Sequence, residues 1–244
     1  MLVGHGTRDD EGTQQFFQLG ERLAERLGPQ PVEVALLEFQ RPTISDAWTR
    51  LVRQGVQHIH VAPLLLFAAG HAKQDIPHIV RECQAATSGV SFDQARPISR
   101  HRSMVQLVSR RIGDTLALSA AGSSSTALVM VGRGSTDPCA QADMKVLSEV
   151  VSRRIDVAEV FTAFYAMADP PLPEVLDYVA NSGRFSAVVV HPHLLFTGRL
   201  YEAISRQVDQ ASDRFTDIQF RLSSYLGPDP LVAEAICARV RQIE

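Results

Sequence analysis

Two histidines and one glutamate in the first half of the chain have side chains that could handle a metal ion. His5 lies between two glycines, Glu38 ends an apolar run, and His71 follows a glycine. Neutral imidazole is a common ligand for divalent first-row metals, and a carboxylate supplies a hard oxygen ligand or a proton acceptor. Three protein ligands leave coordination positions open. These residue types therefore predict a reactive metal site rather than a closed structural one.

An internal repeat gives the second half a different chemistry at the same positions. Residues 2–9, LVGHGTRD, align with residues 130–137, MVGRGSTD, 128 positions later. The same displacement places Arg133 where the first half has His5, Ala166 where it has Glu38, and Arg199 where it has His71. Guanidinium groups are permanently charged and clamp carboxylates or phosphates. The second half therefore predicts an anion-binding pair, Arg133 and Arg199.

The repeat also predicts the domain organisation. We expect an N-terminal module over residues 1–122, which carries the metal-site histidines, and a degenerate C-terminal module over residues 123–244, which carries the arginines. A serine-rich stretch near residues 119–125 is typical of a linker between them.

Short apolar runs alternate with amphipathic stretches of helical period in both halves, which indicates βα units with parallel sheets. The pattern favours two tandem flavodoxin-like α/β modules, each a four-stranded parallel sheet of order 2-1-3-4 flanked by helices. The first long helix is expected to end at Gly28-Pro29. The expected strands cover residues 2–3, 32–38, 56–66 and 90–94 in the first half, and 127–131, 157–164, 186–191 and 218–221 in the second.

Ligands of open α/β sheets bind outside the carboxyl ends of the strands. His5, Glu38 and His71 each follow or end one of three neighbouring strands, so we expect them to converge over one sheet edge. If the two modules face a common cleft, one wall handles metal and the other holds anions. This asymmetry predicts a large polyanionic organic substrate that receives a metal.

Composition excludes several other classes. The formal net charge of −3 over 244 residues argues against a nucleic-acid binder that uses a general basic surface. No apolar run approaches the length of a membrane span, and the first residues lack the pattern of a secretory signal. Three scattered cysteines suggest neither disulfides nor a thiolate metal site. We expect a cytoplasmic protein without a nucleic-acid or membrane partner.

Three motifs carry a resemblance to a known family: HGTRD from His5, LEFQRP from Leu37, and PLLLFAAGHAKQDIP from Pro63 to Pro77. At these residues the chain resembles the class II tetrapyrrole chelatases, specifically the sirohydrochlorin cobaltochelatase and ferrochelatase family in its two-module form. The resemblance implies a lyase in which His5 and His71 bind the incoming metal and assist deprotonation, with help from Glu38.

The resemblance also implies the substrate and the assembly. The organic substrate is expected to be sirohydrochlorin, a tetrapyrrole with many carboxylates that Arg133 and Arg199 would hold. Co²⁺ is the expected metal substrate, with Fe²⁺ or Ni²⁺ as alternatives, and no tightly bound cofactor is expected. The product would lead to cobalamin or siroheme. A fused duplicate needs no second copy, so we expect a monomer with an internal pseudo-two-fold axis.

Several alternatives stay open at this point. Glu38 could pair only with Arg41, and the two arginines could be solvated surface charges. His58 and His60 form an H-x-H pair, but near the start of a strand, which favours a structural role. His191 and His193 lie nearer a carboxyl end and could contact metal or macrocycle.

Two other functions compete with metal insertion. A histidine phosphatase is disfavoured because its motif is RHG, whereas this chain has GHGTR. A non-catalytic carrier of metal or tetrapyrrole is the stronger rival.

Overall fold

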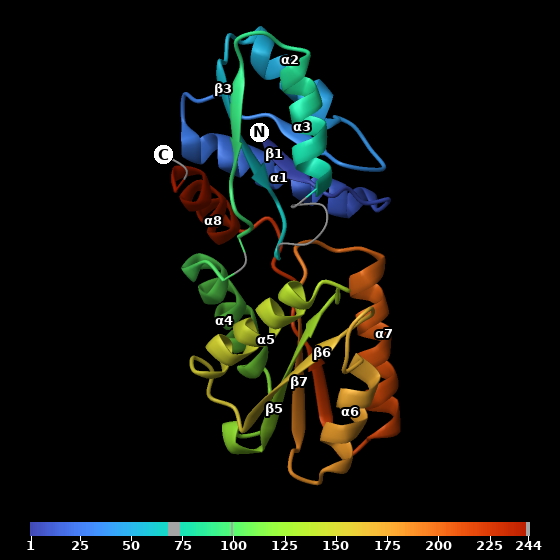
Figure 1. The fold of residues 1–244 in the computed structure, drawn as a ribbon. Coiled ribbons are helices and arrows are strands. Elements are labelled where there is room, and N and C mark those ends of the chain that lie inside the picture. The colour runs from blue at the N-terminus through green and yellow to red at the C-terminus, as the bar shows by residue number, and fades with distance from the viewer. Residues whose placement is uncertain (68–73, 99, 243–244) are drawn as a thin grey trace. The chain divides into compact units, whose positions relative to one another are not determined.

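The computed structural model describes residues 1–67, 74–98 and 100–242, and two four-stranded parallel sheets form within them (Figure 1). The strand orders are β2-β1-β3-β4 and β6-β5-β7-β8. The predicted α/β class and the order 2-1-3-4 are therefore confirmed for both halves. The strands are β1 (Leu2–Gly4), β2 (Val34–Leu36), β3 (His58–Pro63), β4 (Ser91–Gln94), β5 (Thr126–Gly132), β6 (Glu159–Phe164), β7 (Ala187–Pro192) and β8 (Gln219–Leu222).

Helices follow the strands as the sequence predicts. They are α1 (Asp10–Leu27), α2 (Ile44–Arg53), α3 (Ile76–Ala85), α4 (Arg102–Leu116), α5 (Pro138–Ser152), α6 (Leu172–Asn181), α7 (Arg199–Arg214) and α8 (Pro230–Arg241), with a short 3₁₀ turn, η2 (Ser123–Ser125), before β5. Figure 1 shows α6 and α7 on one face of the second sheet and α4 and α5 on the other. Because helices cover both faces, every residue of β5 is buried.

The two faces of each sheet are divided by the alternation of side chains along a strand. In the first sheet Ile59 and Val61 face α2 and α3, where they pack with Trp48 and Val80. Residues 58 and 60 of β3 therefore project from the opposite face. In the second sheet the corresponding core is formed by alternate residues of β5 and by apolar side chains of α6 and α7.

Helix ends fix the loops that follow the first strand of each repeat. Asp9 precedes α1 and accepts a hydrogen bond from the Gly12 backbone N–H at 2.7 Å. Asp137 precedes α5 and accepts one from the Cys139 N–H at 2.9 Å. Helix α1 ends at Gly28, whose φ of 68° suits glycine, as predicted.

Two compact units divide the chain differently from the repeat. One unit contains residues 1–104 and the C-terminal segment from Pro228, and the other contains Val105–Gly227. The modules expected from the repeat, 1–122 and 123–244, differ from this division because α8 packs on α1 and β3 in the first unit. Glu234 of α8 pairs there with Arg26 at 3.1 Å and accepts from the Ser103 hydroxyl at 2.7 Å.

Among the described helices, none is both long enough and apolar enough to cross a membrane.

Candidate functional site

The loop after β1 lies beside the loop after β2 at the carboxyl edge of the first sheet. The Leu37 N–H donates to the Gly4 carbonyl at 2.9 Å, and the Glu38 N–H donates to the His5 carbonyl at 3.0 Å. The backbone ladder therefore continues past the strand ends. It places His5 and Glu38 next to each other, as the sequence predicts.

Gly6 makes this close approach possible. Its φ is 94°, and a Cβ atom at this position would overlap the carbonyl oxygen of Glu38. Any side chain here would push the two loops apart, so the glycine after His5 has a steric function. The His5 ring is partly exposed above it, with Nδ1 3.2 Å from the Gly6 carbonyl oxygen.

Phe39 is a candidate site residue that the sequence analysis missed. Its backbone has a φ of 69°, which is a genuine outlier for a bulky side chain, and 53% of its surface is exposed. The ring stacks on His5 with centroids 6.2 Å apart, and the Arg8 guanidinium carbon lies 4.9 Å from its centroid. Backbone strain of this kind clusters at functional sites. The signal in the sequence was an aromatic residue directly after the candidate carboxylate, in LEFQRP.

The structure says less about the other two predicted site residues of the first half, His71 and Glu38. His71 lies outside the described residues, so its approach to His5 stays a prediction. The Glu38 side chain is exposed. Arg41, which could have been its ion-pair partner, has its Nη1 atom 3.8 Å from the Asp46 carboxylate.

The second unit repeats the backbone of this edge closely. The Tyr165 N–H donates to the Gly132 carbonyl at 2.9 Å, and the Ala166 N–H donates to the Arg133 carbonyl at 3.0 Å. Gly134 has a φ of 89°, and a Cβ atom there would overlap the Ala166 carbonyl oxygen. Arg133 thus occupies the backbone position of His5.

Met167 repeats the unusual backbone of Phe39, 128 positions later. Its φ is 59°, and 52% of its surface is exposed. Both units therefore hold a large apolar side chain in the left-handed region at the edge of the sheet. Because the positive φ recurs at the equivalent position, it belongs to the repeated fold and is not a local distortion of one loop.

Arg133 and Arg199 are both exposed. Arg133 directly follows β5, and Arg199 opens α7 after Gly198, so both belong to the carboxyl side of the second sheet. Their position suits contact with an anionic ligand, and their predicted role in binding substrate stays a prediction.

His191 and His193 are buried inside the second unit. The Nδ1 atom of His191 lies 2.7 Å from the Ser223 hydroxyl oxygen, and the two imidazole centroids are 6.3 Å apart. Burial lowers the pKa of His191 well below its ordinary value, with smaller contributions from His193 and Arg111. Burial likewise lowers the pKa of His193 to about 4. Both rings are neutral at cellular pH, and their burial favours a structural role over contact with a macrocycle.

The fold and the sheet edges define a duplicated α/β protein in which one copy offers imidazole and carboxylate groups and the other offers guanidinium groups. The CbiX family model matches residues 1–115 and again residues 127–243. The chain therefore belongs to the CbiX family, in its two-module form.

Relatives matched over nearly all of this chain carry two different metal names. The chain is 32% identical over 244 residues to the sirohydrochlorin ferrochelatase of Priestia megaterium, covering all of this chain and 89% of that protein. It is 28% identical over 242 residues to the sirohydrochlorin cobaltochelatase of the same organism, covering 99% and 78% respectively. The solved structure of SirB from Bacillus subtilis with Fe³⁺ superposes with a TM-score of 0.87 at 32% identity, covering 99% of this chain and 93% of that one.

Proposed function

We propose that this protein is a sirohydrochlorin chelatase, a lyase of tetrapyrrole biosynthesis, and that it inserts Co²⁺ into sirohydrochlorin. Relatives matched over nearly the whole chain support chelatase activity on this substrate. The observation that carries the proposal within the molecule is the His5–Glu38 edge. It brings an imidazole and a carboxylate from distant segments to the place where α/β sheets bind ligands.

In the proposed reaction, His5 and His71 hold a partly dehydrated divalent ion. Two pyrrole N–H protons must leave the macrocycle as the metal enters, so the charge of the macrocycle centre is unchanged. A histidine or Glu38 accepts these protons one at a time as the general base and passes each to solvent, and the pyrrole nitrogens displace the protein ligands one after another. The backbone pairing of His5 and Glu38 supports this division, because it holds a metal ligand and a proton acceptor from two neighbouring loops side by side.

Phe39 adds an apolar surface for the macrocycle. A half-exposed aromatic ring beside the metal-binding imidazole could stack on the flat face of a tetrapyrrole, and Met167 offers a comparable apolar side chain in the second unit. Arg133 and Arg199 would pair with the substrate carboxylates. That both edges act on one macrocycle stays a prediction.

The choice of cobalt rests on the family resemblance, because the ligands themselves do not identify the metal. Imidazole binds Co²⁺ more tightly than Fe²⁺ in the general affinity order of divalent metals, and Ni²⁺ more tightly still. The relatives bear both cobaltochelatase and ferrochelatase names, so the metal must be measured. Cobalamin or siroheme is the corresponding end product. A cytoplasmic monomer without a tightly bound cofactor remains our expectation.

A steady-state assay of the purified chain with sirohydrochlorin and Co²⁺, Fe²⁺ or Ni²⁺ in turn tests the proposal. We expect many turnovers per protein, faster than the spontaneous reaction, with Co²⁺ the best metal. Spectral change that stops at one equivalent of substrate would instead support the carrier alternative. A higher kcat/KM with Fe²⁺ would replace the cobalt assignment with iron and leave the chelatase assignment standing.

A further inference from the structure

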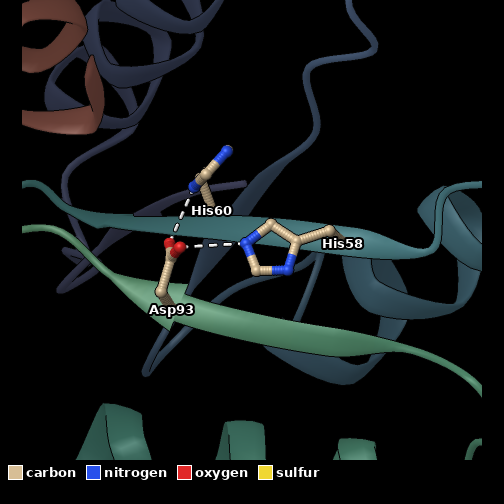
Figure 2. A group of neighbouring side chains, drawn as sticks. All are labelled: His58, His60 and Asp93. Atoms are coloured by element: carbon tan, nitrogen blue, oxygen red, sulfur yellow. Dashed lines mark hydrogen bonds and ion pairs between the residues drawn. The ribbon is translucent and has the colours of Figure 1, made fainter. Parts of the chain in front are cut away.

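We propose that His58, His60 and Asp93 form a second binding site for a divalent transition-metal ion, separate from the His5 edge. The three side chains converge from β3 and β4 on one face of the first sheet (Figure 2). One potential ligand atom from each residue lies within 4.8 Å of the others. From the sequence, a structural role was expected for His58 and His60, and Asp93 was not a candidate.

The strand geometry brings these residues together. His58 and His60 alternate with the buried Ile59, so both imidazoles project from the same face of β3. The parallel register pairs His60 with Asp93 of β4 and His58 with Ser91. Each ligand is therefore positioned by a strand of the sheet, and a strand backbone holds ligands more rigidly than a loop does.

Each carboxylate oxygen of Asp93 contacts a different imidazole. Oδ2 lies 2.9 Å from His58 Nε2, and Oδ1 lies 2.7 Å from His60 Nδ1. Figure 2 shows the carboxylate between the two rings, where one ion could replace the hydrogen bonds. Since metal–ligand bonds are about 2.0–2.2 Å long, small side-chain rotations would bring all three ligands to one ion.

A further contact orients one of the ligands. The Nδ1 atom of His58 lies 2.7 Å from the Ser91 hydroxyl oxygen. Metal-binding histidines usually engage their second nitrogen in such a hydrogen bond, which fixes the ring orientation. This contact leaves Nε2, the atom that faces Asp93, as the ligand atom of His58.

The ligand set indicates the class of metal. Two imidazoles and one carboxylate suit Zn²⁺, Co²⁺, Ni²⁺ or Cu²⁺, whereas Mg²⁺ and Ca²⁺ prefer oxygen ligands. The side chains of His58, His60 and Asp93 are 44%, 29% and 28% exposed, so an ion can reach them and keep water in its open positions. Because β4 is an edge strand, a bound ion would fasten that edge to β3.

The proposed site is distant from the His5 edge within the same unit. The register pairs Val3 with Pro63, so His5 is level with Leu65, five residues beyond His60. At a rise of about 3.3 Å per residue, this corresponds to roughly 16 Å along the strands. One ion cannot bridge these positions, so the cluster would bind an additional equivalent of metal.

Zinc binding by the metal-free chain of 244 residues tests the proposal. The background variant is His5→Ala, which removes a predicted ligand of the insertion site. We expect isothermal titration with ZnCl₂ to show an equivalent whose Kd rises at least about tenfold when His60→Gln and Asp93→Asn are added. The same equivalent should raise the melting temperature of His5→Ala and not that of the triple variant.

The matched control is His78→Gln in the same background, because His78 is an exposed histidine that pairs with Glu82 on α3 outside the cluster. It should leave zinc binding unchanged. The far-UV circular dichroism spectrum should show that every variant is folded, and Asp93→Asn alone serves if the triple variant is not. Equal zinc binding with and without the cluster, or none in His5→Ala, would overturn the proposal. Neither result bears on the chelatase proposal, which the turnover assay tests separately.

Discussion

The carboxyl edges of the two sheets share one backbone and differ in chemistry. After β1 and after β5, a glycine with positive φ approaches a backbone carbonyl of the neighbouring loop. In that neighbouring loop, the residue after the carbonyl is large, apolar and exposed, and it also has a positive φ. Yet His5 stands where the second unit has Arg133, and Glu38 stands where it has Ala166. The backbone of this edge therefore does not depend on the side chains that would bind metal.

This difference has a physical reason. The loop shape depends on strand-like backbone hydrogen bonds and on the absence of a Cβ atom at Gly6 and Gly134. These two requirements tolerate little change in the backbone or at the glycines. The side chains at positions 5 and 133 are at least partly exposed, so exchanging imidazole for guanidinium there disturbs little packing. A duplicated scaffold can thus keep its loop backbone while the exposed side chains at the two sheet edges differ in chemistry.

The largest structural effect is expected from adding a methyl group at the shared glycines. Gly6→Ala and Gly134→Ala should each lower the free energy of unfolding by at least about 3 kcal/mol, because the Cβ atom meets a backbone carbonyl. Gly55→Ala is the control, since Gly55 has a positive φ of 81° with no atom within 4 Å of a Cβ, and should cost about 1–2 kcal/mol. Urea denaturation measures all three. Equal losses would show that steric overlap does not maintain the two edges.

The buried histidines of the second unit should make stability depend on pH. Their folded-state pKa values are lowered, so the unfolded chain binds more protons below its ordinary histidine pKa. The contribution of these neutral histidines to the free energy of unfolding is fully present above about pH 6.5. It is lost as the pH falls towards their folded-state pKa values. His193 alone should cost about 2 kcal/mol at pH 5.

Urea unfolding at pH 7.5 and pH 5 measures this loss, and His193→Gln should reduce it. The exposed His78 provides the control, because His78→Gln should leave the pH dependence unchanged. If His193→Gln lost as much stability on acidification as the wild type, the burial of His193 would not be a cause of the pH dependence.

Substitutions of the exposed apolar residues at the two sheet edges test whether each edge contacts the substrate. Phe39→Ala should raise the KM for sirohydrochlorin about three- to tenfold, the worth of one stacking contact, with a smaller rise for Met167→Ala. Phe39→Gly should raise KM similarly but stabilise the fold by relieving strain at positive φ. Tyr178, a 65% exposed ring on α6, is the control for losing a surface aromatic. A Phe39→Ala enzyme with unchanged KM would remove the stacking role.

The smallest effect is expected at Arg199. Arg199→Ala should raise KM about two- to fivefold at low salt, and the difference should shrink at high ionic strength because exposed charges are screened. Kinetics at two salt concentrations measure this effect. An unchanged KM at low salt would remove Arg199 from the predicted anion-binding pair and leave Arg133.

Most of the fold could be predicted from the sequence, because the repeat and the alternation of apolar runs with helical segments define each βα unit. Two strand lengths in the first half were overestimated: residues 32–38 and 56–66 were expected, but β2 is Val34–Leu36 and β3 is His58–Pro63. Apolar residues continue beyond the hydrogen-bonded strands. The packing of α8 on the first unit was not predicted, since helical periodicity gives an apolar face but not its partner.

The proximity of His5 and Glu38 was predicted because parallel strands end at one edge. Phe39 was missed because the sequence shows an aromatic residue after Glu38 but not the positive φ that places its ring beside His5. Asp93 was missed because pairing it with His60 requires the register between β3 and β4, which depends on tertiary packing.

The central claim is that the first unit performs the metal chemistry and the second holds the anion. Steady-state kinetics of His5→Ala and Arg133→Ala, side by side with saturating Co²⁺ and varied sirohydrochlorin, test it most directly. We predict that His5→Ala lowers kcat at least about 100-fold, whereas Arg133→Ala keeps kcat within about threefold and raises KM. A kcat equally low in Arg133→Ala, with an unchanged KM, would contradict it.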